Sequence, residues 1–339
     1  MKIVILNTIF SGIDVLNSVA SAITVDTVIG LSPLTNTANI SGFVDQKEIC
    51  ENKGINYVEI SDYSLRDASD QQKILNIEID ILLVAGWQRL IPEWLISHCS
   101  ICAVGSHGSP YGITEGRGRS PQNWALILGK TSFNLSIFKI TPGIDDGATI
   151  KDCTFEISQF DTIASTHHKV SQLTAQMFID SIEDNSIINS HFTEQTGIPK
   201  YLPMRKPEDG EIDWFQSSLT IHNFIRALTE PYPGAFSLLG NEKIFFLQAY
   251  PYFLDYFSNE NPGSIIKTFA NGDFLVKTGD SFMLVTKYLS SNNCNKLIEG
   301  QSFESCKSQE QYNRIISRHI SKYPELPIVE DILELGNLK

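Results

Sequence analysis

The chain has 339 residues, which is enough for more than one packed unit, and two units are the default expectation. Its 26 Lys and Arg against 39 Asp and Glu give a net charge of −13, which argues against a general nucleic-acid-binding surface. The 42% of apolar residues is ordinary for a globular protein. No apolar run reaches the roughly 18 residues that a membrane span needs.

The cysteines and the N-terminus indicate the compartment. The apolar run in residues 1–6 is too short for a signal sequence and predicts a first strand. Six cysteines without secreted-type spacing favour reduced thiols and a cytoplasmic protein. Cys99 and Cys102 form a C-x-x-C beside His98, but zinc needs four ligands and no second pair follows. We therefore expect two small core residues here and no metal site.

Apolar, β-branched runs alternate with helical spacing over the first 105 residues. This alternation predicts a Rossmann-like, mostly parallel α/β sheet, whose ligands would bind beyond the carboxyl ends of the strands. No G-x-G-x-x-G follows the first strand, which argues against a dinucleotide. The predicted strands are 3–6, 23–31, 56–60, 79–85 and 101–105, and the predicted helical stretches are 13–19, 47–53, 69–75 and 92–96.

The remainder divides at a break-rich segment, 195–203. Before it we expect a helix at 122–128, a strand at 134–140 and a long helix at 161–182, whose His167 and His168 should lie on a solvated face. After it, a helix at 219–228 and five short runs at hairpin spacing predict a smaller β-rich, barrel-like domain. The expected domains are 1–195 (catalytic), 196–206 (linker), 207–300 (β-barrel-like) and 301–339 (helical tail).

Two residues of the stretch 100–150 suit acid–base chemistry. His107 follows an apolar strand and precedes a glycine, so it should lie at the rim of the sheet, although a lone histidine is more often a packing or surface residue. Asp145 lies in a glycine-rich turn, where turn formation explains an aspartate equally well. Its neighbour Asp146 leaves the assignment open.

Arg117 and Arg119 flank Gly118 just before the predicted helix start at Ser120-Pro121. Guanidinium groups near a helix N-terminus suit a phosphate or a carboxylate. The alternative to an anion site is that both arginines are ordinary solvated charges of a loop, and without further evidence this alternative is favoured.

Three motifs of this stretch together resemble the folate-dependent formyltransferases, which include methionyl-tRNA and sugar N-formyltransferases. They are His107-Gly-Ser, Gly116-Arg-Gly-Arg-Ser-Pro-x-x-Trp124-Ala and Pro142-Gly-Ile-Asp145-x-Gly147. Leu83-Val-Ala-Gly-Trp87-x-Arg-Leu-Ile-Pro92 looks like the family's strand before the folate pocket. The segments 205–214 and 225–236 resemble the start of the second domain in two-domain members of the family, most closely in those that act on nucleotide-linked amino sugars. The resemblance covers roughly residues 1–290.

The resemblance implies formyl transfer from N10-formyltetrahydrofolate to an amine, through a tetrahedral oxyanion. His107 would take the amine proton or stabilise the oxyanion, and Asp145 would orient and charge-balance His107 or relay the proton through water. The implied donor-binding residues are Gln88, Leu90, Ile91, Ile140 and Asp145. The implied acceptor-binding residues are Ser109, Arg117, Arg119 and Arg226. A nucleotide sugar is the expected partner, and neither general nucleic-acid binding nor a membrane is expected. The sequence leaves a homodimer open.

One departure from the family pattern concerns the oxyanion. The family has Asn-x-His-x-[ST], whereas this chain has Gly105 two residues before His107. Losing one oxyanion donor costs about 3 kcal/mol of barrier. Ser106 could replace the amide only if the strand bulges, because consecutive strand residues face opposite sides. Asn123 or a bound water is the other candidate.

Three readings of the function remain open on the sequence. The first is a sugar N-formyltransferase that formylates a nucleotide-linked amino sugar for surface-polysaccharide synthesis. The second is formylation of another small amine, such as a hydroxyornithine-type side chain. The third is a catalytically silent protein that binds folate or a nucleotide sugar, as the loss of the asparagine at Gly105 would allow.

Overall fold

The computed structural model describes residues 1–37, 40, 42–254, 259–290 and 297–337. By its contacts the chain forms two units, and neither is continuous in sequence. Unit 1 comprises residues 1–117, 132–156 and 167–199, and unit 2 comprises residues 118–131, 157–166 and 200–339. The domains expected from the sequence were consecutive, whereas two short segments of the first 195 residues belong by contact to unit 2.

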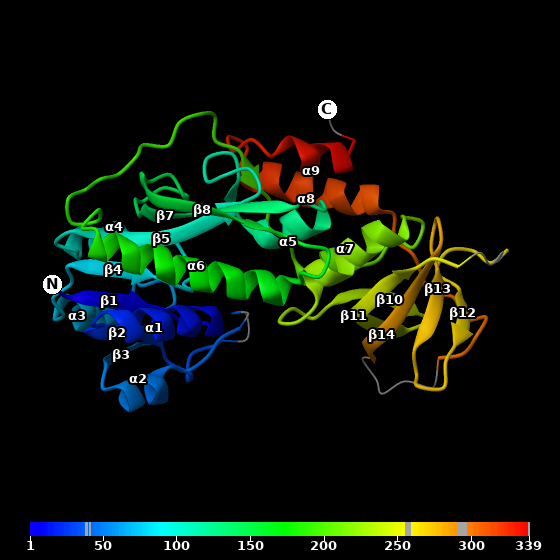
Figure 1. The fold of residues 1–339 in the computed structure, drawn as a ribbon, viewed down its shortest axis with the longest axis horizontal. Helices are drawn as coiled ribbons and strands as arrows, with labels where there is room; N and C mark the ends of the chain where they lie inside the picture. The colour runs from blue at the N-terminus through cyan, green and yellow to red at the C-terminus, as the bar shows by residue number, and fades with distance from the viewer. Residues whose placement is uncertain (38–39, 41, 255–258, 291–296, 338–339) are drawn as a thin grey trace. The chain divides into compact units, whose positions relative to one another are not determined.

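Unit 1 contains a seven-stranded sheet in the order β3-β2-β1-β4-β5-β7-β8 (Figure 1). Neighbours are parallel from β3 to β5, and β7 and β8 add antiparallel to one edge. The predicted Rossmann-like, mostly parallel sheet is therefore confirmed. The strands are β1 (Ile3–Leu6), β2 (Thr27–Leu31), β3 (Asn56–Ile60), β4 (Ile81–Val84), β5 (Cys102–Ser109), β7 (Ser132–Lys139) and β8 (Thr149–Glu156).

Helices cover both faces of this sheet, because its central strands are apolar on both sides. One core joins the sheet to α1, α2 and α6 through Leu16, Cys50 and Phe178. A second core joins the other face to α3 and α4 through Ile74 and Leu95. The helices are α1 (Phe10–Ala22), α2 (Lys47–Lys53), α3 (Ala68–Leu75), α4 (Glu93–His98) and α6 (Ile163–Glu183).

The strand β8 was not predicted, and its first residue, Thr149, pairs with the segment that follows α6. Its burial alternates between half-buried and exposed, as expected for an edge strand with polar residues at every second position. Thr149 at its start exchanges two backbone hydrogen bonds of 2.8 Å with Thr193. This bridge ties the segment after α6 to the sheet.

Unit 2 contains a five-stranded antiparallel sheet in the order β10-β11-β14-β13-β12. The predicted β-rich second domain is thereby confirmed. An aromatic cluster fills its core: Trp214 stacks on Phe303, and Phe246 meets both rings edge-on. The strands are β10 (Ala235–Leu239), β11 (Glu242–Tyr252), β12 (Ile265–Thr268), β13 (Phe274–Lys277) and β14 (Phe282–Ser290).

The other elements of unit 2 are mainly helical, and the C-terminal tail is one of its packed parts. The segment expected to be a helical tail contains helices at residues 308–322 and 330–335, and its residues 338–339 lie outside the described ranges. Tyr312 of the tail packs on Trp124, and Arg318 pairs with the buried Asp209. The elements are α5 (Pro121–Ile127), η1 (Pro207–Gly210), α7 (Ser218–Leu228), α8 (Ser308–Lys322), α9 (Glu330–Leu335) and the two-residue strand β9 (Tyr201–Leu202). The two-residue strand β6 (Arg117–Gly118) begins with the last residue of unit 1. No helix in the described part of the chain is long and apolar enough to cross a bilayer.

Candidate active site

His107 lies where β5 extends past its parallel neighbour. The last residue of β5 paired with β4 is Gly105, whereas the pairing with β7 continues to Ser109 and sets His107 opposite Ser136. The prediction placed His107 just after a strand, but the strand continues for two residues beyond it. Because β4 has already ended, His107 still lies beyond the carboxyl end of a neighbouring parallel strand, where ligands of such sheets bind.

The two ring nitrogens of His107 have different partners. Nε2 lies 2.8 Å from the Gly116 carbonyl oxygen, and Nδ1 lies 3.5 Å from a carboxylate oxygen of Asp145. A carbonyl only accepts, so Nε2 carries the proton that this bond requires. Nδ1 is then the nitrogen with a free lone pair in the neutral ring. His107 can therefore accept a proton at Nδ1, where the Asp145 carboxylate stabilises the resulting imidazolium.

The structure distinguishes the two adjacent aspartates. Asp145 faces His107 and has a left-handed backbone with φ of 49°, which aspartate tolerates better than most residues. The Asp146 carboxylate accepts a hydrogen bond from the Thr141 hydroxyl and so closes its own turn. Asp145 is thus placed for chemistry and Asp146 for turn formation.

A glycine explains how the chain passes so near His107. A β-carbon added at Gly116 would lie only 1.7 Å from the Ser109 hydroxyl oxygen. Ser109 is fully buried, donates to the Gly112 carbonyl at 2.7 Å and accepts from the Tyr111 N–H. Its hydroxyl is thus used within this turn, which argues against the predicted contact of Ser109 with an acceptor.

The space of the missing family asparagine is filled by apolar atoms. A β-carbon at Gly105 would lie 3.1 Å from the Ile140 Cδ1 and 3.3 Å from the Phe138 Cζ. The pairing of β5 with β7 is in regular register from Val104 to Ser109, so Ser106 and His107 face opposite sides of the sheet. The bulge that Ser106 would need to support an oxyanion is therefore absent from this strand pair.

Arg117 is buried rather than a solvated loop charge. Its side chain is 7% exposed, its Nη2 donates to the Gln195 Oε1 at 2.7 Å, and its Nε has no hydrogen-bond partner among the described residues. No carboxylate of the described ranges forms an ion pair with it. A buried guanidinium without a counter-ion favours an anionic group on a ligand.

Gln195 is the residue that sequence reasoning missed. It begins the break-rich segment 195–203, for which we predicted no role in the site, whereas its side-chain Nε2 donates to the carbonyls of Asp145 and Gly147, both at 2.8 Å. The same side chain accepts the Arg117 bond, so it joins two predicted site residues. No sequence pattern indicated this, because Gln195 stands 50 residues from Asp145 and 78 from Arg117.

The predicted donor-binding residues divide by exposure. Ile91 and Ile140 are buried and belong to one apolar core, whereas Gln88 is exposed and Leu90 is 60% exposed. Directly before Gln88, the Trp87 indole N–H is buried without a partner among the described residues. The loop after β4 thus offers an exposed apolar side chain and an unsatisfied donor, which suits a flat heterocycle with nitrogen and oxygen acceptors.

Three predicted residues belong to unit 2, where the structure gives two of them other contacts. The Asn123 amide donates to the Ala227 carbonyl at 2.7 Å. Arg226 donates from Nη1 to the carbonyls of Ser158 and Asp161, and burial lowers its pKa despite the opposing charge of Asp161. Both side chains therefore hold unit 2 together locally, while Arg119 is exposed.

The paired cysteines lie in the core of unit 1. Burial raises the pKa of Cys99 to about 12 and that of Cys102 to about 11, and the Cys99 thiol donates to the Leu95 carbonyl. Thiols in this state remain protonated and are poor metal ligands. Within the described ranges, no group of three His, Cys, Asp or Glu side chains could hold a metal ion.

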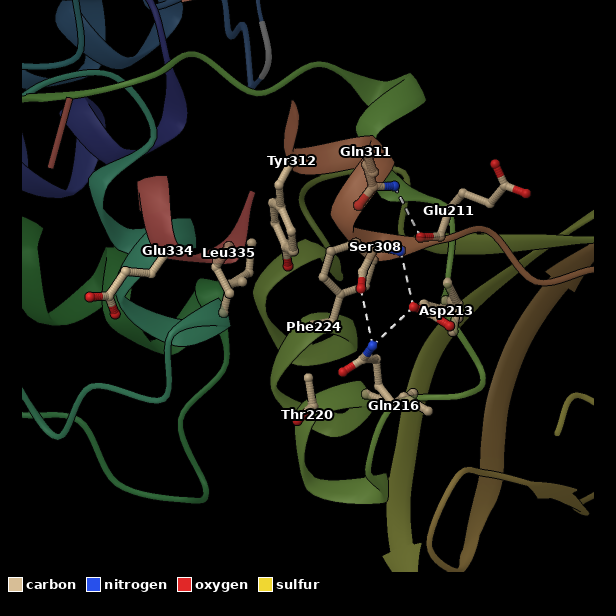
Figure 2. A pocket seen from close by; sticks show the side chains of 13 residues that line it. Glu211, Asp213, Gln216, Thr220, Phe224, Ser308, Gln311, Tyr312, Glu334 and Leu335 are labelled. Atoms are coloured by element: carbon tan, nitrogen blue, oxygen red, sulfur yellow. Dashed lines mark hydrogen bonds between the residues drawn. The ribbon is translucent and has the colours of Figure 1, made fainter. Parts of the chain in front are cut away.

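A separate cavity of about 290 Å³ lies within unit 2 (Figure 2). Its acidic and amide side chains mainly bond one another: Gln216 donates to Asp213 and Ser308, and Gln311 donates to the Glu211 carbonyl. None of the residues predicted from the sequence lines it. The candidate active site in unit 1 therefore rests on the geometry around His107 and not on this cavity.

Comparison with known families agrees with this fold. The formyl transferase family matches residues 19–182, and the formyl transferase C-terminal domain matches residues 205–303. The chain therefore belongs to the formyl transferase family, as the motifs around His107 predicted. The matched ranges end before α8, so the C-terminal helices lie outside both.

Solved structures share the fold at low identity. HypX from Aquifex aeolicus in complex with tetrahydrofolic acid is 16% identical with a TM-score of 0.61, and the match covers 97% of this chain but 58% of HypX. WlaRD, a sugar 3N-formyl transferase solved with dTDP and 5-N-formyl-THF, is 19% identical with a TM-score of 0.57, covering 87% of this chain and 99% of WlaRD. Methionyl-tRNA formyltransferase from Clostridium thermocellum is 19% identical with a TM-score of 0.54, covering 85% and 100%.

Proposed function

We propose that this protein transfers a formyl group from N10-formyltetrahydrofolate to a primary amine of a nucleotide-linked amino sugar. The observation that carries the proposal is the pairing of His107 Nδ1 with the Asp145 carboxylate at 3.5 Å, in a chain that belongs to the formyl transferase family. The cytoplasm, where the sequence predicts reduced thiols, is the proposed compartment.

The proposed reaction needs one proton acceptor near the attacking amine. The amine nitrogen bonds to the formyl carbon, the C=O bond opens to an oxyanion, and the nitrogen becomes positively charged. His107 then takes a proton from that nitrogen at Nδ1, because its Nε2 proton is held by the Gly116 carbonyl. When the oxyanion collapses, the C–N10 bond breaks and His107 returns the proton to N10.

The loop after β4 is the proposed donor site. Tetrahydrofolate offers a flat heterocycle rich in acceptors, which suits the exposed Leu90 and the unsatisfied Trp87 N–H. Gln88 and Ile91 are proposed to contribute backbone groups. Ile140 is proposed to pack against the formyl-bearing end, since its side chain fills the space beside Gly105.

Arg117 is proposed to meet the acceptor's anion. A diphosphate satisfies a buried guanidinium that has no carboxylate partner among the described residues. The net charge of −13 disfavours tRNA and leaves a small anionic acceptor as the better match. A carboxylate on a hydroxyornithine-type amine would fit the same group, so the acceptor panel includes both.

Gly105 favours a second candidate, a homologue that binds formylated folate without turnover. The apolar atoms of Ile140 and Phe138 occupy the space of the family asparagine, and Ser106 faces away from His107. Under this candidate the protein binds the folate but lacks a sufficient oxyanion donor.

One experiment separates the two candidates. The purified chain is incubated with N10-formyltetrahydrofolate and a panel of nucleotide-linked amino sugars, a hydroxyornithine derivative and methionyl-tRNA. Tetrahydrofolate release and the mass of the formylated product are measured, and folate affinity is measured in parallel. We expect turnover with a nucleotide-linked amino sugar; tight folate binding with no formylated product from any amine would refute the enzyme and support the second candidate.

A further inference from the structure

Gln195 uses the whole hydrogen-bonding capacity of its side chain in unit 1. Its Oε1 accepts from Arg117 Nη2 at 2.7 Å and from the Thr114 hydroxyl at 3.1 Å. Its Nε2 donates to the carbonyls of Asp145 and Gly147, both at 2.8 Å. An amide group has two donors and two acceptor lone pairs, and all four are used here.

The orientation of this amide is determined by its partners. A guanidinium only donates and carbonyl oxygens only accept, so exchanging Oε1 and Nε2 would break the bonds to Arg117, Asp145 and Gly147. The backbone near Gln195 is itself anchored, because Thr193 exchanges two hydrogen bonds of 2.8 Å with Thr149 at the start of β8. The side chain therefore extends from the edge of the sheet.

The Asp145 turn needs such a restraint. Asp145 has φ of 49°, a conformation that costs free energy for a residue with a β-carbon and persists only where its surroundings hold it. Gln195 binds the backbone carbonyl of Asp145 itself and that of Gly147, two residues further along the chain. The side-chain carboxylate of Asp145 lies next to His107 Nδ1.

We propose that Gln195 is a positioning residue that sets the Asp145 carboxylate against His107 and couples this pair to the anion-binding Arg117. The inference rests on the proposed function for its catalytic consequence, but its geometric content does not depend on turnover. An acceptor anion that binds Arg117 is thereby connected, through the Gln195 amide, to the pair of Asp145 and His107.

Gln195→Glu separates the two halves of this role. The carboxylate keeps an acceptor for Arg117 and adds an ion pair, but it loses the donor and sets negative charge against the carbonyls of Asp145 and Gly147. If Gln195 served only to hold Arg117, Gln195→Glu would keep the wild-type kcat and raise only the acceptor KM, because the added carboxylate neutralises the charge of Arg117, and Gln195→Ala would be impaired. If it positions Asp145, both variants are impaired.

The matched control is Gln176→Glu, the same change at an exposed position of α6 in the same unit. We expect Gln195→Glu to lower kcat by roughly 10- to 100-fold with a smaller change in the acceptor KM, since displacements near 1 Å cost about that much. We expect Gln176→Glu to match the wild type. In an Asp145→Asn background, Gln195→Glu should cost little further, because the two changes act through one carboxylate.

A spectroscopic measurement tests the geometry without turnover. Two-bond ¹H–¹⁵N NMR spectra report the His107 ring nitrogens, and we expect the Nδ1 resonance to move in Gln195→Glu and to stay in Gln176→Glu. An unchanged Nδ1 resonance, or full additivity with Asp145→Asn, would overturn the inference. A wild type that shows no formyl transfer, with the Nδ1 shift present, would refute the proposed function and leave the positioning role standing.

Discussion

The surroundings of His107 and the aromatic core of unit 2 are built in different ways. Around His107, each group has one specific polar partner: Nε2 has the Gly116 carbonyl, and Nδ1 has the Asp145 carboxylate. In unit 2, Trp214 contacts both Phe246 and Phe303, and each of these rings contacts the other. Apolar packing is non-directional and shared among many neighbours, whereas a polar site depends on single atoms. Substitutions in the first region should therefore change activity, and substitutions in the second should change stability.

The largest expected effect is that of His107→Ala on activity. Removing a general base typically costs 10²- to 10⁴-fold in rate, so formyl transfer should fall by about that factor. The free energy of unfolding should fall by only about 1 kcal/mol, because one hydrogen bond to Gly116 is lost. Steady-state kinetics and urea unfolding measure both. A variant with full activity would exclude the mechanism proposed for His107.

The converse change is Trp214→Ala in unit 2. Trp214 is fully buried, and its indole N–H donates to the Ser237 hydroxyl at 2.9 Å. We expect a loss of about 3–5 kcal/mol in the free energy of unfolding, the usual cost of a cavity of this size. Formyl transfer per folded molecule should stay near that of the wild type when assayed below the unfolding transition. Equal losses in both quantities would contradict the division between the two regions.

The two neighbouring aspartates sharpen the comparison within the site. Asp145→Asn removes the charge beside His107 Nδ1 and should lower kcat on the order of 100-fold, since a close charge pair near a protein surface is worth a few kcal/mol. Asp146→Asn alters only the bond from Thr141 and should change kcat little. Parallel kinetics of the two variants test the assignment. A larger effect at Asp146 would reverse it.

The last prediction concerns stability at acid pH and His167 of α6, and it involves no change in activity. Desolvation, followed by the neighbouring charge of His168, lowers the pKa of His167 from 6.5 to about 4; His167 is half-buried, whereas the sequence predicted a solvated position. The unfolded chain binds this proton below about pH 6.5 and the folded chain does not. The free energy of unfolding therefore falls as pH drops from 6.5 to 4, by up to ~1.4 kcal/mol per pH unit.

Replacing the half-buried His167 imidazole isolates this contribution. His167→Gln should show a shallower decline of stability between pH 6.5 and 4 than the wild type, measured by urea unfolding at several pH values. His168→Gln is the matched control, because His168 is exposed. The same slope in His167→Gln and the wild type would show that His167 does not remain neutral in the folded chain.

The amino-acid sequence by itself determined most of the local structure. The predicted helix at 47–53 and strand at 56–60 match α2 and β3 residue for residue, because each is a short periodic run bounded by Gly54 or a turn. The strand β8 was missed because an edge strand with polar residues at alternate positions lacks the continuous apolar run of its buried neighbours. The family was also identified from the sequence, since its motifs combine rare residues at fixed spacing.

Only the tertiary structure decided which atoms meet. Asp145 and Asp146 are equivalent as sequence, and they differ because the Gln195 amide and the Thr141 hydroxyl bind different parts of one turn. Arg117 and Arg226 both suited an anion, yet Arg226 is used by two backbone carbonyls whereas the Nε of Arg117 has no partner among the described residues. Hydrogen bonds are directional over less than 3.5 Å, and residues 50 to 78 positions apart reach that range only through the packing of the sheet.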